Sequence, residues 1–138
     1  MTYTADARSL THAGTLAMLT AAANKAEEIG QPQCIVIVDA SGEMLGELRM
    51  SGAKFLSRKS AFAKAQTAAA TRGPSANVPD HMKGPLASAT GGKVTGLPGG
   101  LPIFVDGFLL GGIGIGSGTG EQDVEVALAA LQAIGADT

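Results

Sequence analysis

Apolar and polar positions near the start of the chain follow a helical spacing. Alanines and leucines recur at steps of three or four between residues 10 and 21, which is typical of one face of a helix. Thr4 or Asp6 has the side chain expected of a helix cap. The sequence Gly-Gln-Pro at residues 30–32 is typical of a helix end, with a glycine just past the last turn and a proline soon after it. The pattern therefore predicts a helix from a cap at Thr4 or Asp6 to about Glu28.

The next segment has the pattern of a β-hairpin. Residues 34–38 form a continuous, mostly β-branched apolar run of strand length. The polar residues 39–42 are typical of a turn. Residues 43–50 then alternate in part, with Met44 and Leu48 on one expected face.

A second helix and an irregular stretch follow this hairpin. The sequence predicts a helix from Ala53 to about Thr71, ended by glycine and proline. Residues 74–100 contain four prolines, with room for a short helix near residues 80–89. Loops of this length in a compact domain usually have a role, so we expect a lid or a binding segment.

The last part of the chain repeats the order of hairpin and helix. The apolar runs 101–105 and 108–115 are separated by Asp-Gly at 106–107, the strongest local hairpin signal in the chain. A last helix is predicted from Glu121 to about Ile134. Two hairpins among helices indicate an α+β fold, an antiparallel sheet with helices packed on one or both faces. The length of 138 residues favours a single domain, residues 1–138.

Composition narrows the classes of function. The net charge is −2, with one Tyr and no Trp, so the chain lacks the basic and aromatic surface that nucleic acids require. No apolar run is long enough to span a membrane. The first residues show neither a charged nor an apolar signal region, so we expect a cytoplasmic protein without a signal peptide. The single Cys34 lies in an apolar run and is expected to be a buried small side chain.

Glycine is concentrated in one segment, which holds 13 of the 20 glycines between Gly84 and Gly120. Residues 111–120 lead from a strand through a glycine-rich turn into a helix, where free N–H groups and the helix dipole can hold an anion. Alternatively, Thr119 and Gln122 form a capping box, and the glycines allow close approach of a ligand or another subunit. Both interpretations remain open at this point. The candidate contacts are Gly114, Gly116, Gly118 and Thr119.

Two types of side chain suggest chemistry elsewhere. Lys64 lies in a stripe of serines and threonines on the second predicted helix. Such a stripe is usually solvated, but a lysine on a cavity wall would pair with a carboxylate or propionate. His12 and His81 are the only histidines, without zinc-site spacing. Each histidine is then either an ordinary surface or core residue or the single ligand of a haem iron, because one histidine is enough to hold that iron.

Several segments of the chain match the pattern of one known family. They are the C-terminal segments 99–103, 106–107, 112–115 and 118–123, and the earlier segments 38–42, 49–53 and 63–68. Through these segments the chain resembles the GlcG/HbpS family, which is related to the C-terminal domain of PduO-type adenosyltransferases. The resemblance implies an antiparallel sheet of about five strands with helices packed on it, and symmetric homo-oligomers from dimers up to octamers. It also implies binding of haem in some members, with a histidine near the first helix as ligand, and His12 has a suitable position.

Three hypotheses for the function follow. The first is a small oligomeric protein that binds haem or a related anionic small molecule, with His12 as axial ligand and Arg49, Lys64 and the glycine-rich turn at the anionic edge. The second is a small catabolic enzyme acting on an organic acid in a subunit-interface pocket, with Lys64 or Asp39 as acid or base and Arg49 holding a carboxylate. The third is an oligomeric accessory protein of a metabolic operon.

Overall fold

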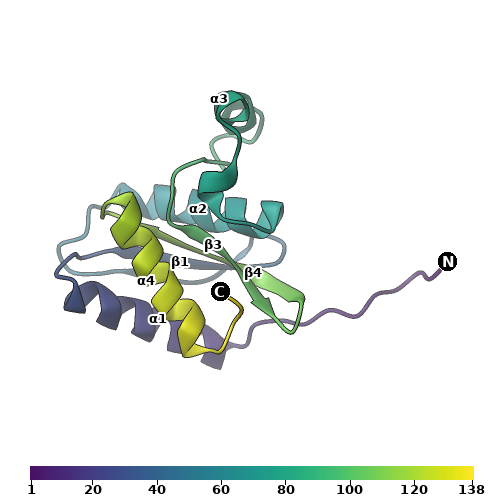
Figure 1. Cartoon of the computed structure of the whole chain (residues 1–138), viewed down its shortest axis with the longest axis horizontal. Coiled ribbons are helices and arrows are strands. Elements are labelled where there is room, and N and C mark those ends of the chain that lie inside the picture. The colour runs from purple at the N-terminus through teal and green to yellow at the C-terminus, as the bar shows by residue number, and fades with distance from the viewer.

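The computed structural model describes all 138 residues. Its helices pack on the two faces of one antiparallel sheet (Figure 1). The strand order in the sheet is β2-β1-β4-β3. The predicted α+β fold is confirmed. The sheet has four strands rather than about five, because the two hairpins supply all of its strands and the segment between α2 and Gly100 contains no strand. The elements are α1 (His12–Glu28), β1 (Cys34–Asp39), β2 (Met44–Arg49), α2 (Ser57–Thr71), a 3-10 turn (Ser75–Asn77), α3 (Asp80–Ala89), β3 (Gly100–Val105), β4 (Phe108–Gly116) and α4 (Gly120–Ala133).

The first helix begins later than the sequence suggested. Its cap is Thr11, whose side chain accepts a hydrogen bond from the backbone N–H of Gly14 at 3.1 Å. The predicted caps Thr4 and Asp6 lie in an exposed segment without regular structure. Residues 4–9 contain no large apolar side chain, so a helix there would bury nothing against the sheet. That prediction was wrong for this reason.

Other boundaries differ less. The second helix begins at Ser57 rather than at Ala53. The residues before it form a turn, in which the backbone N–H of Lys54 donates to Ser117 Oγ at 3.0 Å. The short helix expected near residues 80–89 is α3. None of the helices has the length and apolar character needed to cross a membrane.

The sheet separates two helical layers. Alternate residues of β1 point to opposite faces, as strand geometry requires. On one face they pack with α1 and α4, and on the other they pack with α2 (Figure 1). The buried side chains of the first face include Ile35, Ile37, Ile113 and Ile115 with Met18, Val126 and Leu131, and those of the second are Cys34, Val36, Val38, Ala61, Ala65 and Ala69.

Three of the four glycines of β4, Gly112, Gly114 and Gly116, face α2. A Cβ atom on Gly114 would lie 1.9 Å from the carbonyl oxygen of Ala61, and one on Gly112 would lie 2.2 Å from that of Ala65. The helix backbone therefore rests directly on the strand backbone, which only glycine allows. The close approach inferred from the glycine pattern is thus made by a helix of the same chain.

Replacing Gly114 with alanine tests this packing. Because the atoms in the way are helix backbone, which cannot rotate aside, we expect Gly114→Ala to lower the free energy of unfolding by roughly 3 kcal/mol, the upper end of the usual cost of overpacking. The measurement is urea unfolding followed by circular dichroism. The matched control is Gly84→Ala, because a Cβ on Gly84 would meet nothing within 4 Å, so we expect a change within about 1 kcal/mol. Equal effects of the two substitutions would contradict the packing argument.

Candidate functional site

The turn between β4 and α4 uses its own polar groups to hold its shape. Thr119 and Gln122 form the predicted capping box, in which Thr119 Oγ1 accepts from the Gln122 N–H at 3.2 Å and Gln122 Oε1 accepts from the Thr119 N–H at 2.9 Å. The N–H of Gly118 donates to Asp123 Oδ1 at 3.1 Å. These three N–H groups are therefore engaged within the chain rather than presented to an anion.

Lys64 reaches this turn from α2. Its Nζ donates to the carbonyl oxygen of Ile115 at 2.7 Å and to Asp123 Oδ2 at 3.0 Å. Both charged side chains are buried, with relative exposures of 5% for Lys64 and 2% for Asp123. The expectation that Lys64 lies on a solvated stripe was wrong, because its ammonium group is the partner of a buried carboxylate on α4.

Asp123 is the residue of this cluster that the sequence interpretation did not assign. Burial raises the pKa of its carboxyl above the ordinary value, while the Lys64 ammonium and the Gly118 N–H oppose that rise. The fully buried Gln33 lies alongside, since a Cβ on Gly118 would lie 2.6 Å from Gln33 Nε2 and 2.8 Å from Asp123 Oδ1. Gly118 therefore borders a buried polar cluster.

The three residues suggested for catalysis do not converge within the chain. Asp39 Oδ1 accepts from the backbone N–H groups of Ser41 and Glu43, at 2.8 and 3.1 Å, and so shapes the β1–β2 turn. Arg49 pairs with Cys34 at the other end of that hairpin, about 17 Å away at the usual rise of a strand. Lys64 is on α2, on the face of the sheet opposite to α1 and α4. The structure thus offers no common site for the three side chains.

Arg49 instead borders a hollow of about 510 Å³ beside the C-terminal half of α1. His12 is the exposed first residue of the same helix. A helix of 17 residues is about 25 Å long, so the two candidate ligand contacts lie at its opposite ends.

The segment before His12 is tied to the β3–β4 turn. The Nη1 atom of Arg8 lies 3.0 Å from Asp106 Oδ2, and its guanidinium group lies over the Phe108 ring, 4.3 Å from the centroid. Sequence reasoning did not single out Arg8, because its partners follow about 100 residues later.

His81, the other histidine, is exposed in the first turn of α3. No three His, Cys, Asp or Glu side chains gather as a metal site.

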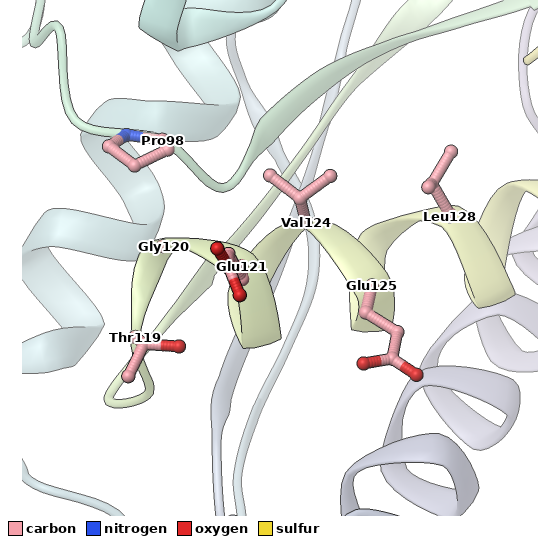
Figure 2. A pocket seen from close by; sticks show the side chains of 7 residues that line it. All are labelled: Pro98, Thr119, Gly120, Glu121, Val124, Glu125 and Leu128. Atoms are coloured by element: carbon pink, nitrogen blue, oxygen red, sulfur yellow. The ribbon is translucent and has the colours of Figure 1, made fainter.

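A hollow of about 850 Å³ runs along the outer face of α4 and is called the α4 groove below. Figure 2 shows Val124 and Leu128 on the same side of the helix, with Pro98 across from them and the Glu121 and Glu125 carboxylates projecting from α4. A smaller hollow of about 280 Å³ shares Leu128 and continues onto the edge strand β3. Thr119 is the predicted site residue that borders the α4 groove. The lining residues are Pro98, Thr119, Gly120, Glu121, Val124, Glu125 and Leu128.

The chain belongs to the HbpS-like family, described as "Haem degrading protein HbpS-like", which it matches over residues 10–132. It is 39% identical over 123 residues to the corrinoid adenosyltransferase PduO of Citrobacter freundii, a match that covers 86% of this chain and 37% of PduO. The chain thus spans little more than a third of that relative's length. It is also 33% identical to an uncharacterized 15.0 kDa protein from the dhaT-dhaS intergenic region of Citrobacter freundii, over 89% of this chain and 90% of that protein.

Solved structures share the whole fold. A complex of PduOC with heme superposes with a TM-score of 0.88 and 32% identity, covering 95% of this chain and 99% of that one. The ORFY protein of Klebsiella pneumoniae has a TM-score of 0.91 and 26% identity, covering 100% and 99% of the two chains. A double mutant of HbpS from Streptomyces reticuli has a TM-score of 0.83 and 27% identity, covering 94% and 89%.

Removing the Lys64 charge tests the role of the buried pair. Lys64→Met leaves Asp123 buried without its partner, so we expect the free energy of unfolding at pH 7 to fall by about 3–5 kcal/mol. The matched control is the double variant Lys64→Met with Asp123→Asn, which removes both charges and keeps an acceptor for the Gly118 N–H. We expect it to recover most of the loss. A double variant as unstable as Lys64→Met would contradict this role.

The loss should also depend on pH. Without the ammonium, the pKa of Asp123 rises further above the value of about 3.9 in the unfolded chain. Between those two pKa values the folded state holds a proton that the unfolded state has released, so the free energy of unfolding falls as pH rises. The deficit of Lys64→Met relative to the wild type should therefore be smaller at pH 4 than at pH 7. Urea unfolding at both pH values measures it, and an equal deficit would contradict the assignment.

Proposed function

We propose that this chain is a homo-oligomeric binding protein for haem or a related anionic tetrapyrrole, with His12 as the axial ligand. The observation that carries the proposal is the exposed His12 at the start of α1, in a fold shared over nearly its full length with a protein solved in complex with heme. One histidine is enough to hold a haem iron.

The surface around His12 fits such a group. Leu16 is one turn further along α1 and 60% exposed, so it lies on the same side of the helix as the histidine. The alanines at positions 13 and 17 are exposed as well. This apolar helix surface suits the flat face of a tetrapyrrole, while the imidazole supplies the ligand.

The same geometry favours an oligomer. A ligand on an exposed helix face is covered on one side only, whereas binding sites usually bury most of a ligand's surface. A second copy of the chain would cover the other side. We accordingly propose dimers or larger assemblies up to octamers.

Some candidate residues are left out of the proposed ligand site because they have a structural role. Lys64 and the glycines of β4 are engaged in packing α2 and α4, so they are not assigned to the ligand. Haem would supply a redox-active iron when bound. The contribution of this chain is to ligate the iron through His12 and to shield it through the apolar surface of α1.

Titration with haem tests the proposal. We expect a Soret band shifted from that of free haem when the wild type is titrated, and binding roughly tenfold or more weaker for His12→Ala, which loses an axial ligand. The matched control is His81→Ala, because His81 is exposed on α3, and it should bind as the wild type does. An unchanged free-haem spectrum with the wild type, or loss of binding in His81→Ala alone, would contradict the proposal.

A further inference from the structure

A hollow of about 620 Å³ lies beside α2 and is called the lysine hollow below. Three segments that are distant in sequence border it: one face of α2, the β1–β2 turn and the loop after α3. A smaller hollow of about 170 Å³ shares Gly42, Gln66 and Lys93 with it and extends it along the helix. Volumes of roughly 300–1,000 Å³ are typical of sites for small molecules, so the lysine hollow has the size of a ligand site.

Contacts within the chain hold the walls of the lysine hollow in place. Gln66 Nε2 donates to the carbonyl oxygen of Gly42 at 3.2 Å and joins α2 to the β1–β2 turn. On the other side, the backbone N–H of Thr95 donates to Thr67 Oγ1 at 3.0 Å and joins the loop after α3 to the same helix. The three walls are therefore arranged before a ligand arrives, which lowers the cost of binding.

Two lysine side chains from different walls border this hollow, and neither forms an ion pair. Lys59 is on α2, and Lys93 is on the loop after α3. Only five of the ten Lys and Arg side chains are unpaired, and two of those five border one hollow in a chain whose net charge is −2. Unpaired charges of one sign in a cleft attract a ligand of the opposite sign. The hollow therefore favours an anion.

Glu43 is the acidic residue on the border of the lysine hollow. Its carboxylate forms no ion pair within the chain, so it neutralises neither Lys59 nor Lys93 through a direct contact. It does repel an anion in the hollow. A ligand with two negative groups overcomes this repulsion best, because it contacts both ammonium groups at once.

Phe62 gives the hollow an apolar surface. The residue is half-buried, packs against the core between α2 and the sheet, and borders the hollow one turn after Lys59. An aromatic ring beside charged groups suits a ligand that has a flat apolar part as well as its anionic groups.

We propose that the lysine hollow binds a small organic dianion, either a phosphate monoester or a dicarboxylate. Lys59 and Lys93 are its ammonium contacts, and Phe62 lies beside its apolar part. This site is separate from the proposed haem site, because α2 and α1, which carries His12, pack on opposite faces of the sheet.

Isothermal titration calorimetry of the full chain tests the proposal, with phenyl phosphate and phthalate as probes. We expect saturable binding of at least one probe, and affinity roughly tenfold or more lower for Lys59→Met and for Lys93→Met, because each loses a charge-assisted contact. The matched control is Lys54→Met, which removes an exposed, unpaired lysine outside the hollow and should bind as the wild type does. Absence of binding to both probes, or an equal loss in Lys54→Met, would overturn the proposal.

Two further titrations test the border of the site. Glu43→Gln removes the repelling carboxylate, so we expect the probe to bind several-fold more tightly than to the wild type. Methyl phosphate has the charge of phenyl phosphate without the ring, so it should bind to the wild type more weakly than phenyl phosphate. Weaker binding by Glu43→Gln than by the wild type would overturn the assignment of the anion to this hollow.

A measurement on the wild type avoids any effect of the substitutions on folding. Lysines are acetylated with and without a saturating probe, and their rates of modification are followed by mass spectrometry. We expect the probe to slow the modification of Lys59 and Lys93 and to leave that of Lys54 unchanged. Equal protection of all three, or of none, would overturn the proposal. His12→Ala should bind the probes as the wild type does, so the haem proposal and this one fail separately.

Discussion

The backbone of α2 lies directly on the backbone of β4, and the buried contacts at the end of β4 depend on that approach. Gly112 and Gly114 leave no side chain between helix and strand, so the helix axis sits closer to the sheet than ordinary side chains would permit. This closeness brings the Lys64 ammonium to the end of β4, where it meets the carbonyl oxygen of Ile115 and the carboxylate of Asp123. Asp123 in turn receives the Gly118 N–H. The pair therefore fastens α2, on one face of the sheet, to the start of α4, on the other.

This arrangement gives the glycine-rich segment a structural role. The N–H groups of its turn donate to the capping box and to Asp123, and Gly112, Gly114 and Gly116 face α2 of the same chain. A ligand-binding role must then be supported by outer surfaces. The structure offers three of them, the start of α1 around His12, the α4 groove and the lysine hollow. His12 is exposed to solvent, and a ligand there would be covered on one side only, which is why we propose that copies of the chain assemble.

Features that depend on neighbouring residues could be predicted from the sequence. Asp106 and Gly107 both adopt positive φ angles, of 52° and 80°, as the Asp-Gly signal for a tight hairpin requires. The capping box of Thr119 and Gln122 and the bounds of α3 are equally local. The cap at Thr4 or Asp6 was wrong because the start of a helix also depends on what its first turn can bury. Most of the fold was therefore accessible from local chemistry.

The candidate site was less predictable because its contacts are distant in sequence. Lys64 and Asp123 are separated by 59 residues, and no local pattern links them. One signal was available, since β4 alternates glycine with isoleucine from residue 112 to residue 116, and a strand with glycine at every position of one face allows a helix to pack closely against it.

We propose that this glycine face of β4 serves packing and that the ligand binds elsewhere. The most direct test is a crystal structure of the chain with haem. We expect iron bound to His12, with Lys64 still paired to Asp123. Haem lying over residues 112–118, with Lys64 withdrawn from Asp123, would contradict it.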